Sequence, residues 1–315
     1  MEWTAYAIGM RTRFRGITVR EGMLARGSVG WAEWSPFWDY DDPTCVPWLT
    51  AAREAAHDGW PAPLRDRIPV NCTIPAVGPE AVAAIVRRSS GCRTAKVKVA
   101  EAGQSLADDL ARIEAVRQAL GAAGRIRVDA NGAWSVSQAI TAIEALDRTA
   151  GGLEYVEQPC ASVEELAAVR RRVTTPIAAD ESIRRADDPM RVRELDAADI
   201  VVLKVQPLGG VVACLRIAEQ IGLPVVVSSA LETSIGLAAG VALAAALPDL
   251  PYACGLATGA LLEADVVADP LRPVDGALPV VRPDADEGAL AACRPEPADA
   301  ERWRQRLTRV ERLAG

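Results

Sequence analysis

The sequence contains a single histidine, His57, within the stretch "EAAHDGW". This scarcity excludes a zinc site built from several histidines, and it excludes a Ser-His-Asp site unless His57 is the base. We predict that His57 is an ordinary surface residue on a helix. If the protein is an enzyme, we expect lysine to carry its acid–base chemistry and carboxylates to hold any metal.

Other absences narrow the class of protein. The seven cysteines are scattered singly, with no C-x-x-C pair, which favours reduced thiols in a cytoplasmic protein. The opening stretch "MEWTAYAIGMRTRFRG" has no basic segment followed by an apolar core, so we expect no secretory signal. The longest apolar run, "IGLAAGVALAAALP", is too short and too rich in alanine to span a bilayer, and it predicts a buried helix.

The charge of the chain also limits its partners. The formal net charge is −7, and no basic run is interleaved with aromatic residues. We therefore see no reason to expect nucleic-acid binding. The oligomeric state stays open.

From about residue 69 onward, short β-branched runs alternate with stretches of helical length, at a period of about 25 residues. The first such run is "IPVNCTI" and the eighth is "PYACGLATG". Several predicted helices begin at the N-caps Ser105, Ser135 and Ser162, and some end at a glycine, Gly121 or Gly222. This alternation indicates parallel strands joined by crossover helices.

Eight strands in about 190 residues predict a closed β/α barrel. An open doubly wound sheet is the alternative, but it usually has a glycine-rich turn after its first strand, and "NCTIPAVGPE" has none. We place the barrel in residues 67–264. Residues 1–66 predict short antiparallel strands followed by helical segments, and the last residues end in the helix "ADAERWRQRLTRVERLA". We expect residues 1–66 and about 265–315 to form one small α+β domain.

Charged side chains recur where the predicted barrel strands end. In chain order they are Lys96, Lys98, Asp129, Glu157, Asp180, Glu181 and Lys204. Burying one unpaired charge costs several kcal/mol, so these groups are expected to converge on one another or on a ligand. The seventh strand ends with Ser228 and Ser229, followed by Glu232.

Three carboxylates on adjacent strands suit a hard cation, and Mg²⁺ is the expected ion. The alternative is a buried salt-bridge network in which the lysines only neutralise the acids. Lys96 and Lys98 lie on one face of the strand "TAKVKVA". On a solvated edge such a pair would discourage aggregation, whereas inside a site each lysine would lower the other's pKa.

Taken together, "AKVKV", "VDANGAW", "VEQP", "ADES" and "LKVQPLGG" resemble, in order, the motifs of the enolase superfamily, in its muconate-lactonising-enzyme-like branch. The resemblance covers essentially the whole chain. It implies a modified TIM barrel, (β/α)₇β, with an α+β capping domain, and one Mg²⁺ held by Asp129, Glu157 and Asp180. It further implies that Lys98 and Lys204 act on opposite faces of a carboxylate substrate, and that Lys96 lowers the pKa of Lys98.

Within this branch the chain resembles o-succinylbenzoate synthases of menaquinone biosynthesis. The stretches "RTRFRGITVREG" and "GWAEWSPF" are similar to the cap segments of those enzymes. The implied reaction is dehydration of 2-succinyl-6-hydroxy-2,4-cyclohexadiene-1-carboxylate through an enediolate. The segment "CGLATG" lacks the two acids that dipeptide epimerases of this branch carry there. An N-succinylamino-acid racemase, a muconate cycloisomerase and a non-catalytic binding protein on the same barrel stay as alternatives.

The resemblance and the strand positions also suggest further site residues. The expected substrate contacts are Arg15, Asn131, Ser228, Ser229 and Leu256, with Glu181 as a polar group beside the metal ligands. Two of these assignments have ordinary alternatives. Asn131 precedes a glycine and could be a turn residue, and the arginines of the cap could belong to a plain basic hairpin. Among Arg11, Arg13 and Arg15 the sequence gives no ranking.

Overall fold

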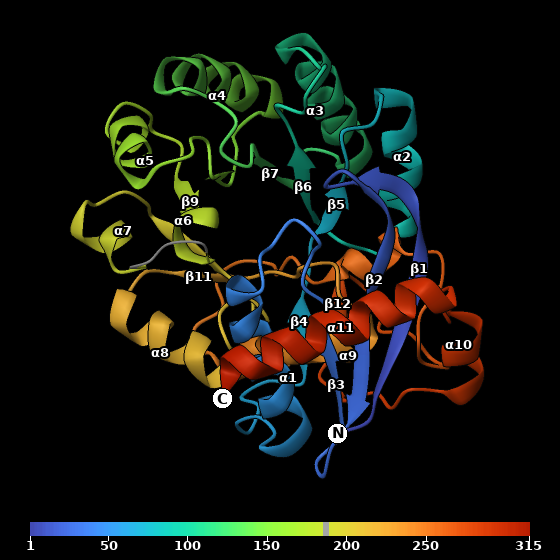
Figure 1. Ribbon diagram of the computed structural model, residues 1–315. Coiled ribbons are helices and arrows are strands. Elements are labelled where there is room, and N and C mark those ends of the chain that lie inside the picture. Colours follow the sequence, from blue (N-terminus) through green and yellow to red (C-terminus); the bar gives the residue numbers. More distant parts are fainter. Residues whose placement is uncertain (185–188) are drawn as a thin grey trace.

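The computed structural model describes residues 1–184 and 189–315. Its centre is a parallel seven-stranded sheet with the strand order β11-β10-β9-β8-β7-β6-β5, curled so that its edges approach each other (Figure 1). Parallel strands buried on both faces are expected where crossover helices cover the outside. The strands are β5 (Cys72–Ile74), β6 (Thr94–Lys98), β7 (Arg125–Asp129), β8 (Val156–Glu157), β9 (Ile177–Ala179), β10 (Ile200–Leu203) and β11 (Val225–Val227).

A short segment around Cys254 and Gly255 closes the barrel. Parallel bridges join Cys254 to Val70 and Gly255 to Ser228. The backbone N–H of Gly255 donates to the carbonyl of Val227 at 2.8 Å. The predicted eighth strand is therefore present as a two-residue connection without a following barrel helix, and the predicted (β/α)₇β barrel with a capping domain is confirmed.

The crossover helices lie outside the strands and start at the predicted caps. Ser105, Ser135 and Ser162 each form a capping box, in which the serine oxygen accepts from the backbone N–H three residues later. The helices are α2 (Pro79–Arg88), α3 (Leu106–Leu120), α4 (Val136–Ala150), α5 (Val163–Arg170), α6 (Glu181–Arg184), α7 (Arg191–Glu194), α8 (Val211–Ile221) and α9 (Ser234–Ala246).

The two ends of the chain build one cap over the barrel. In Figure 1 the C-terminal helix α11 lies against the N-terminal elements, with contacts to β1 and α1. The rings of Trp34 and Trp303 meet edge to face at 5.5 Å, which ties α11 to the cap sheet. The cap consists of β1 (Trp3–Phe14), β2 (Ile17–Arg26), β3 (Trp31–Trp34), η1 (Pro43–Cys45), α1 (Val46–His57), α10 (Glu287–Ala292) and α11 (Pro297–Ala314). The domain boundaries at residues 66 and 264 stay predictions.

One predicted strand is divided in the structure. The run "IPVNCTI" contributes β5 to the barrel, whereas β4 (Arg67–Pro69) pairs antiparallel with β12 (Ala277–Pro279). Pro69 has no N–H to donate within a central sheet, so a change of partner at this residue is physically reasonable. The prediction of a single continuous strand was wrong here.

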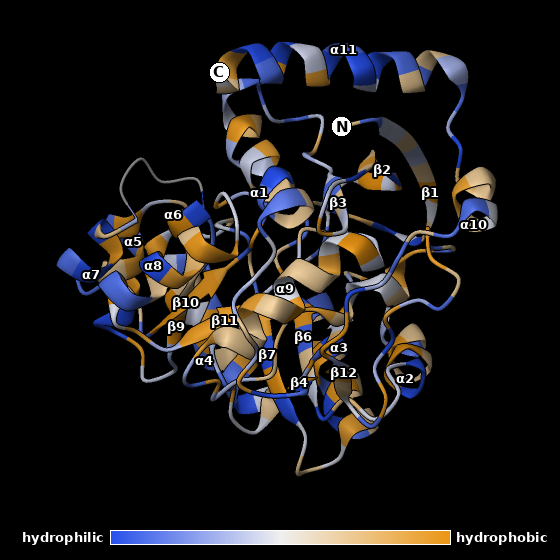
Figure 2. Cartoon of the chain, turned by 90° about the horizontal axis from the view of Figure 1, so that it is seen from below, coloured by the Kyte–Doolittle hydropathy of each residue, from blue (hydrophilic) through white to orange (hydrophobic). Residues whose placement is uncertain are grey.

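The predicted buried helix is confirmed. Every residue of α9 except Ala246 is buried, and Figure 2 shows the helix as apolar along its length. Among the helices that the structure describes, none is long and apolar enough to cross a membrane. All seven cysteines are free and buried. His57 is exposed at the end of α1, as predicted, with its Nδ1 3.2 Å from the hydroxyl of Ser28.

Candidate active site

The charged residues predicted to converge do meet at one end of the barrel. Parallel strands place their carboxyl ends on the same edge, and the register aligns Lys98 with Asp129 and Asp129 with Glu157. Asp180 follows β9, and Lys204 follows β10. In the eight-membered closed barrel, Lys98 on β6 and Lys204 beyond β10 come from opposite sides.

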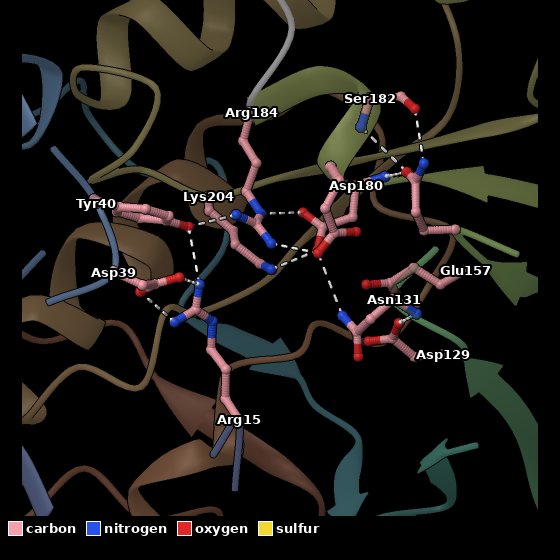
Figure 3. Close-up of polar contacts among 12 residues, drawn as sticks. Arg15, Asp39, Tyr40, Asp129, Asn131, Glu157, Asp180, Ser182, Arg184 and Lys204 are labelled. Atoms are coloured by element: carbon pink, nitrogen blue, oxygen red, sulfur yellow. Dashed lines mark hydrogen bonds and ion pairs between the residues drawn. The ribbon is translucent and has the colours of Figure 1, made fainter. Parts of the chain in front are cut away.

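Each of the three buried carboxylates is paired with the ammonium group of a lysine. Lys96 Nζ lies 2.5 Å from Glu157 Oε1 and 2.9 Å from Asp129 Oδ2, and Lys98 Nζ lies 2.6 Å from that same Asp129 oxygen. Lys204 Nζ lies 2.6 Å from Asp180 Oδ2 (Figure 3). The chain contains only three lysines, so its entire lysine content lies in this one site.

The pKa values of the three acids of the site are shifted in different directions. Although burial raises the pKa of Asp129, the neighbouring Lys96 and Lys98 outweigh it and hold that pKa well below its usual value. Asp180 likewise keeps a lowered pKa despite burial, because of Arg184 and Lys204. Burial, reinforced by the charge of Asp129, raises the pKa of Glu157 to about 7.

The same carboxylates raise the pKa of Lys96. Burial lowers its pKa, but the carboxylates of Asp129 and Glu157 outweigh burial and hold the pKa of Lys96 well above its usual value. Its proximity to Lys98 agrees with the sequence analysis, since the two ammonium groups share one carboxylate oxygen. The expected lowering of the pKa of Lys98 stays a prediction.

The chemistry of the donor set fits a hard divalent cation. Asp129, Glu157 and Asp180 offer oxygen atoms from three adjacent strands, and each side chain is at most 1% exposed. Glu157 Oε2 is buried and accepts no hydrogen bond from the residues described. As the side chains stand, each of these carboxylates is paired with a lysine, and no group of three His, Cys, Asp or Glu residues within 1–184 and 189–315 is arranged to hold an ion.

A cavity of about 320 Å³ opens over these groups. The barrel contributes the three lysines together with Ser228 and Ser229 to its wall. The cap contributes Arg13, Phe14, Arg15 and Tyr40. A cavity of this size between a barrel end and a cap is typical of small-molecule sites.

The arginines of the cap have different surroundings. Arg15 makes two hydrogen bonds to Asp39, at 3.0 and 3.1 Å (Figure 3). Its guanidinium lies 3.9 Å from the centre of the Phe37 ring. Arg11 donates to the carbonyl of Glu263 at 3.4 Å. Arg13 lines the cavity but makes no hydrogen bond or ion pair with any residue that the structure describes.

Polar residues predicted near the ligands are brought to the site. Asn131 Oδ1 accepts from Lys98 Nζ at 2.5 Å, and Asn131 Nδ2 donates to Glu181 Oε1 at 3.3 Å. Asn131 also has a positive φ of 47°, so it is a turn residue and a site residue at once. Arg184, which was not predicted from the sequence, also belongs to the site, with its Nε 2.9 Å from Asp180 Oδ1. Its position four residues after Asp180, on a helical turn, was the available signal.

Leu256 is not brought to the cavity. Its side chain is 1% exposed and packs beside Gly240 of α9, so its prediction as a substrate contact is not supported by its position. The strand ends after two residues and continues into η2 (Ala257–Leu261), which turns Gly255 and Thr258 toward the cavity instead. Thr258 Oγ1 lies 2.5 Å from the hydroxyl of Ser229.

A second acidic pair lies buried between the cap and the barrel. Glu33 on β3 accepts from the hydroxyls of Tyr6 and Ser35 at 2.7 and 2.6 Å. Glu232, only 3% exposed, accepts from the backbone N–H of Ala230 at 2.6 Å. Burial, with the charge of Glu33 in addition, raises the pKa of Glu232 to about 7.

This raised pKa gives a testable dependence of stability on pH. Because the unfolded chain releases the proton of Glu232 near the ordinary value of 4.5 and the folded chain only near 7, stability falls as the pH rises through this window. Glutamine does not titrate, so Glu232→Gln should not show this loss. The free energy of unfolding of Glu232→Gln, minus that of wild type, should therefore be larger at pH 8 than at pH 5, by up to about 3 kcal/mol. Urea unfolding at both pH values measures it, with the exposed Glu219→Gln as control. The prediction would be contradicted if wild type and Glu232→Gln differed in free energy of unfolding by the same amount at pH 5 and at pH 8.

Comparisons with known proteins agree with this architecture. The "Enolase N-terminal domain-like" model matches residues 5–56, and the "Enolase C-terminal domain-like" model matches residues 80–286. The L-Ala-D/L-Glu epimerase from Bacillus subtilis has the same fold, with a TM-score of 0.79 and 24% identity over 90% of this chain and 96% of that one.

Curated relatives are much closer in sequence. The o-succinylbenzoate synthase of Thermobifida fusca is 66% identical over 98% of this chain and 95% of that protein. The o-succinylbenzoate synthase of Mycolicibacterium smegmatis is 57% identical over 92% of this chain and 89% of that protein. The chain therefore belongs to the enolase superfamily and, within it, to the o-succinylbenzoate synthase family.

Proposed function

We propose that this protein is an o-succinylbenzoate synthase, which dehydrates 2-succinyl-6-hydroxy-2,4-cyclohexadiene-1-carboxylate to o-succinylbenzoate in the route to menaquinone. The observation that carries the proposal is the 66% identity, over 98% of the chain, to a synthase of that name. The site supports it, because the predicted lysines and carboxylates surround one cavity. Formation of an aromatic ring makes the reaction energetically downhill.

Lys98 is proposed as the acid–base residue. In its neutral form, Lys98 Nζ would take the proton from the ring carbon that bears the carboxylate. The same ammonium group would then protonate the leaving hydroxyl, so that the C–O bond breaks and water departs. The position of Lys98 at the cavity wall, between Asp129 and Asn131, supports both roles, because these two acceptors orient its Nζ.

Lys204 and Lys96 are proposed to act through their charge. Lys204 reaches the cavity from the opposite side of the barrel, where its ammonium group would stabilise negative charge that develops on the substrate. Lys96 is ion-paired with two carboxylates and would favour the neutral form of its neighbour Lys98. Ser228, Ser229 and Asn131 are proposed as polar contacts of the substrate.

The carboxylates are proposed to hold the metal. Asp129, Glu157 and Asp180 would bind Mg²⁺, which would supply positive charge to the substrate carboxylate as its α-proton leaves. Glu181 accepts a hydrogen bond from Asn131, and Arg184 donates one to Asp180. These contacts would hold Asn131 and Asp180 in place. The unpartnered Glu157 Oε2 supports this assignment.

The second carboxylate of the substrate needs a cation away from the metal. Arg15 is neutralised by Asp39, whereas Arg13 lines the same cavity without a partner among the residues described. We therefore propose Arg13 as the stronger contact of the succinyl carboxylate, with Arg15 as the weaker. Arg13→Ala should raise KM about ten- to a hundredfold with a smaller change in kcat, because a charge-assisted hydrogen bond is lost.

Steady-state kinetics of three matched alanine variants, at Arg11, Arg13 and Arg15, checks this ranking. Arg11→Ala is the control, since Arg11 does not line the cavity and contacts only a backbone carbonyl. A larger rise in KM for Arg15→Ala than for Arg13→Ala would reverse the ranking. Equal and small effects for all three would remove the arginines from substrate binding.

The proposed function is tested by following the loss of the diene absorbance with and without excess EDTA. The same protein would be incubated in D₂O with both enantiomers of an N-succinyl amino acid. Fast, metal-dependent dehydration with little exchange of the α-proton supports the synthase. Exchange with both enantiomers and slow dehydration would instead identify a racemase.

A further inference from the structure

A buried arginine of the cap, Arg20, donates hydrogen bonds to backbone carbonyls of a barrel loop. Arg20 on β2 is 2% exposed, and its positive charge partly offsets the rise that burial causes in the pKa of Glu33 and of Glu232. Its Nε donates to the carbonyl of Leu231 at 3.0 Å, and its Nη2 donates to the carbonyl of Ala230 at 3.2 Å. A buried guanidinium aimed at backbone carbonyls fixes the path of that backbone, because its donors have a rigid planar arrangement.

Ser35 joins a second barrel loop to the same arginine. Arg20 Nη2 donates to the hydroxyl of Ser35 at 2.8 Å. The backbone N–H of Ser35 donates to Gln206 Oε1, and Gln206 Nε2 donates back to the Ser35 hydroxyl, both at 3.2 Å. Gln206 follows Lys204 by two residues, so Ser35 contacts the segment that carries this lysine.

Both loops that are held in this way form the wall of the cavity. Ala230 and Leu231 line it on one side, and Lys204 and Pro207 line it beside them. Leu231 has a positive φ of 65°, a conformation that is costly for a branched side chain and persists only where neighbours impose it. The carbonyl of Leu231 accepts from Arg20, and its backbone N–H donates to the Ser229 hydroxyl at 3.2 Å, so both sides of this residue are held.

We propose that Arg20 and Ser35 are positioning residues, which clamp the loop of residues 228–233 and the segment after Lys204 in the arrangement that shapes the cavity. The cap thus contributes to turnover through the barrel loops as well as through its own contacts with substrate. The kinetic part of this inference rests on the proposed function, whereas its structural part does not.

The test compares Arg20→Lys with Arg26→Lys, a matched variant of an exposed arginine on the same strand. Lysine keeps the charge but cannot reproduce the planar set of donors. Arg20→Lys should lower kcat/KM about ten- to a hundredfold in fully folded protein, with a raised KM, because small displacements of site groups are costly. Hydrogen exchange should accelerate in residues 228–233 but not in α4, and Arg26→Lys should behave as wild type.

Ser35→Ala and Gln206→Leu keep the inference testable if Arg20→Lys does not fold. Each should lower kcat/KM severalfold. The double variant should lose less than the product of the two single losses, because both substitutions remove the same hydrogen bond between Ser35 and Gln206. The proposal would be overturned if folded Arg20→Lys had wild-type kcat/KM and unchanged hydrogen exchange in residues 228–233. If Arg20→Lys does not fold, the same result for Ser35→Ala would overturn it. If the wild-type protein has no synthase activity, the proposed function is overturned. The positioning role of Arg20 is then still tested by hydrogen exchange, which needs no substrate.

Discussion

Lys98→Ala is expected to lower kcat/KM for the dehydration by about ten-thousandfold, because it removes the group proposed to take and return the proton. The fold should survive the change, since Asp129 keeps its ion pair with Lys96 at 2.9 Å. Exchange of substrate α-protons with D₂O should be lost together with turnover. Stopped-flow absorbance and a thermal melt of the same preparation measure the two effects.

Lys98→Arg is the matched control for this prediction. Arginine preserves the positive charge beside Asp129 but does not release its proton at accessible pH, so this variant should be nearly as inactive as Lys98→Ala. Substantial turnover by Lys98→Arg would falsify the assignment of the base and leave only an electrostatic role. Since the chain has only three lysines, lysine-specific isotope labelling should also resolve their signals and allow the pKa of Lys98 to be measured directly.

Metal removal is expected to have an effect of similar size. Excess EDTA should reduce turnover at least about a hundredfold, and added Mg²⁺ should restore it, because the substrate carboxylate then regains its positive partner. By mass action, Mg²⁺ should also raise the melting temperature of the wild-type protein in proportion to the logarithm of its concentration above Kd. This second measurement needs no substrate.

Two carboxamide variants separate binding at the site from unspecific effects of the salt. Glu157→Gln should lose both the Mg²⁺-dependent activity and the rise in melting temperature, because it removes one proposed ligand. The exposed Glu144→Gln on α4 should retain both. Full turnover in excess EDTA, or an equal rise in melting temperature for Glu157→Gln, would leave the carboxylates as a salt-bridge network only.

The sequence by itself determined the order of elements and the position of the site. Local periodicity and caps such as Ser105 and Ser135 depend on residues a few positions apart, so they can be read without a structure. The meeting of Lys98, Asp129 and Glu157 could also be predicted, because parallel strands bring their carboxyl ends to one edge.

Only the tertiary structure decided which side chains face the cavity and which are already paired. Arg15 is neutralised by Asp39. Leu256 turns into the core beside Gly240, because the last strand of the barrel ends early. The contact of Arg20 with Leu231 joins residues 211 positions apart. Such contacts depend on how two separately built layers pack together, and neither local propensity nor periodicity encodes the geometry of that packing.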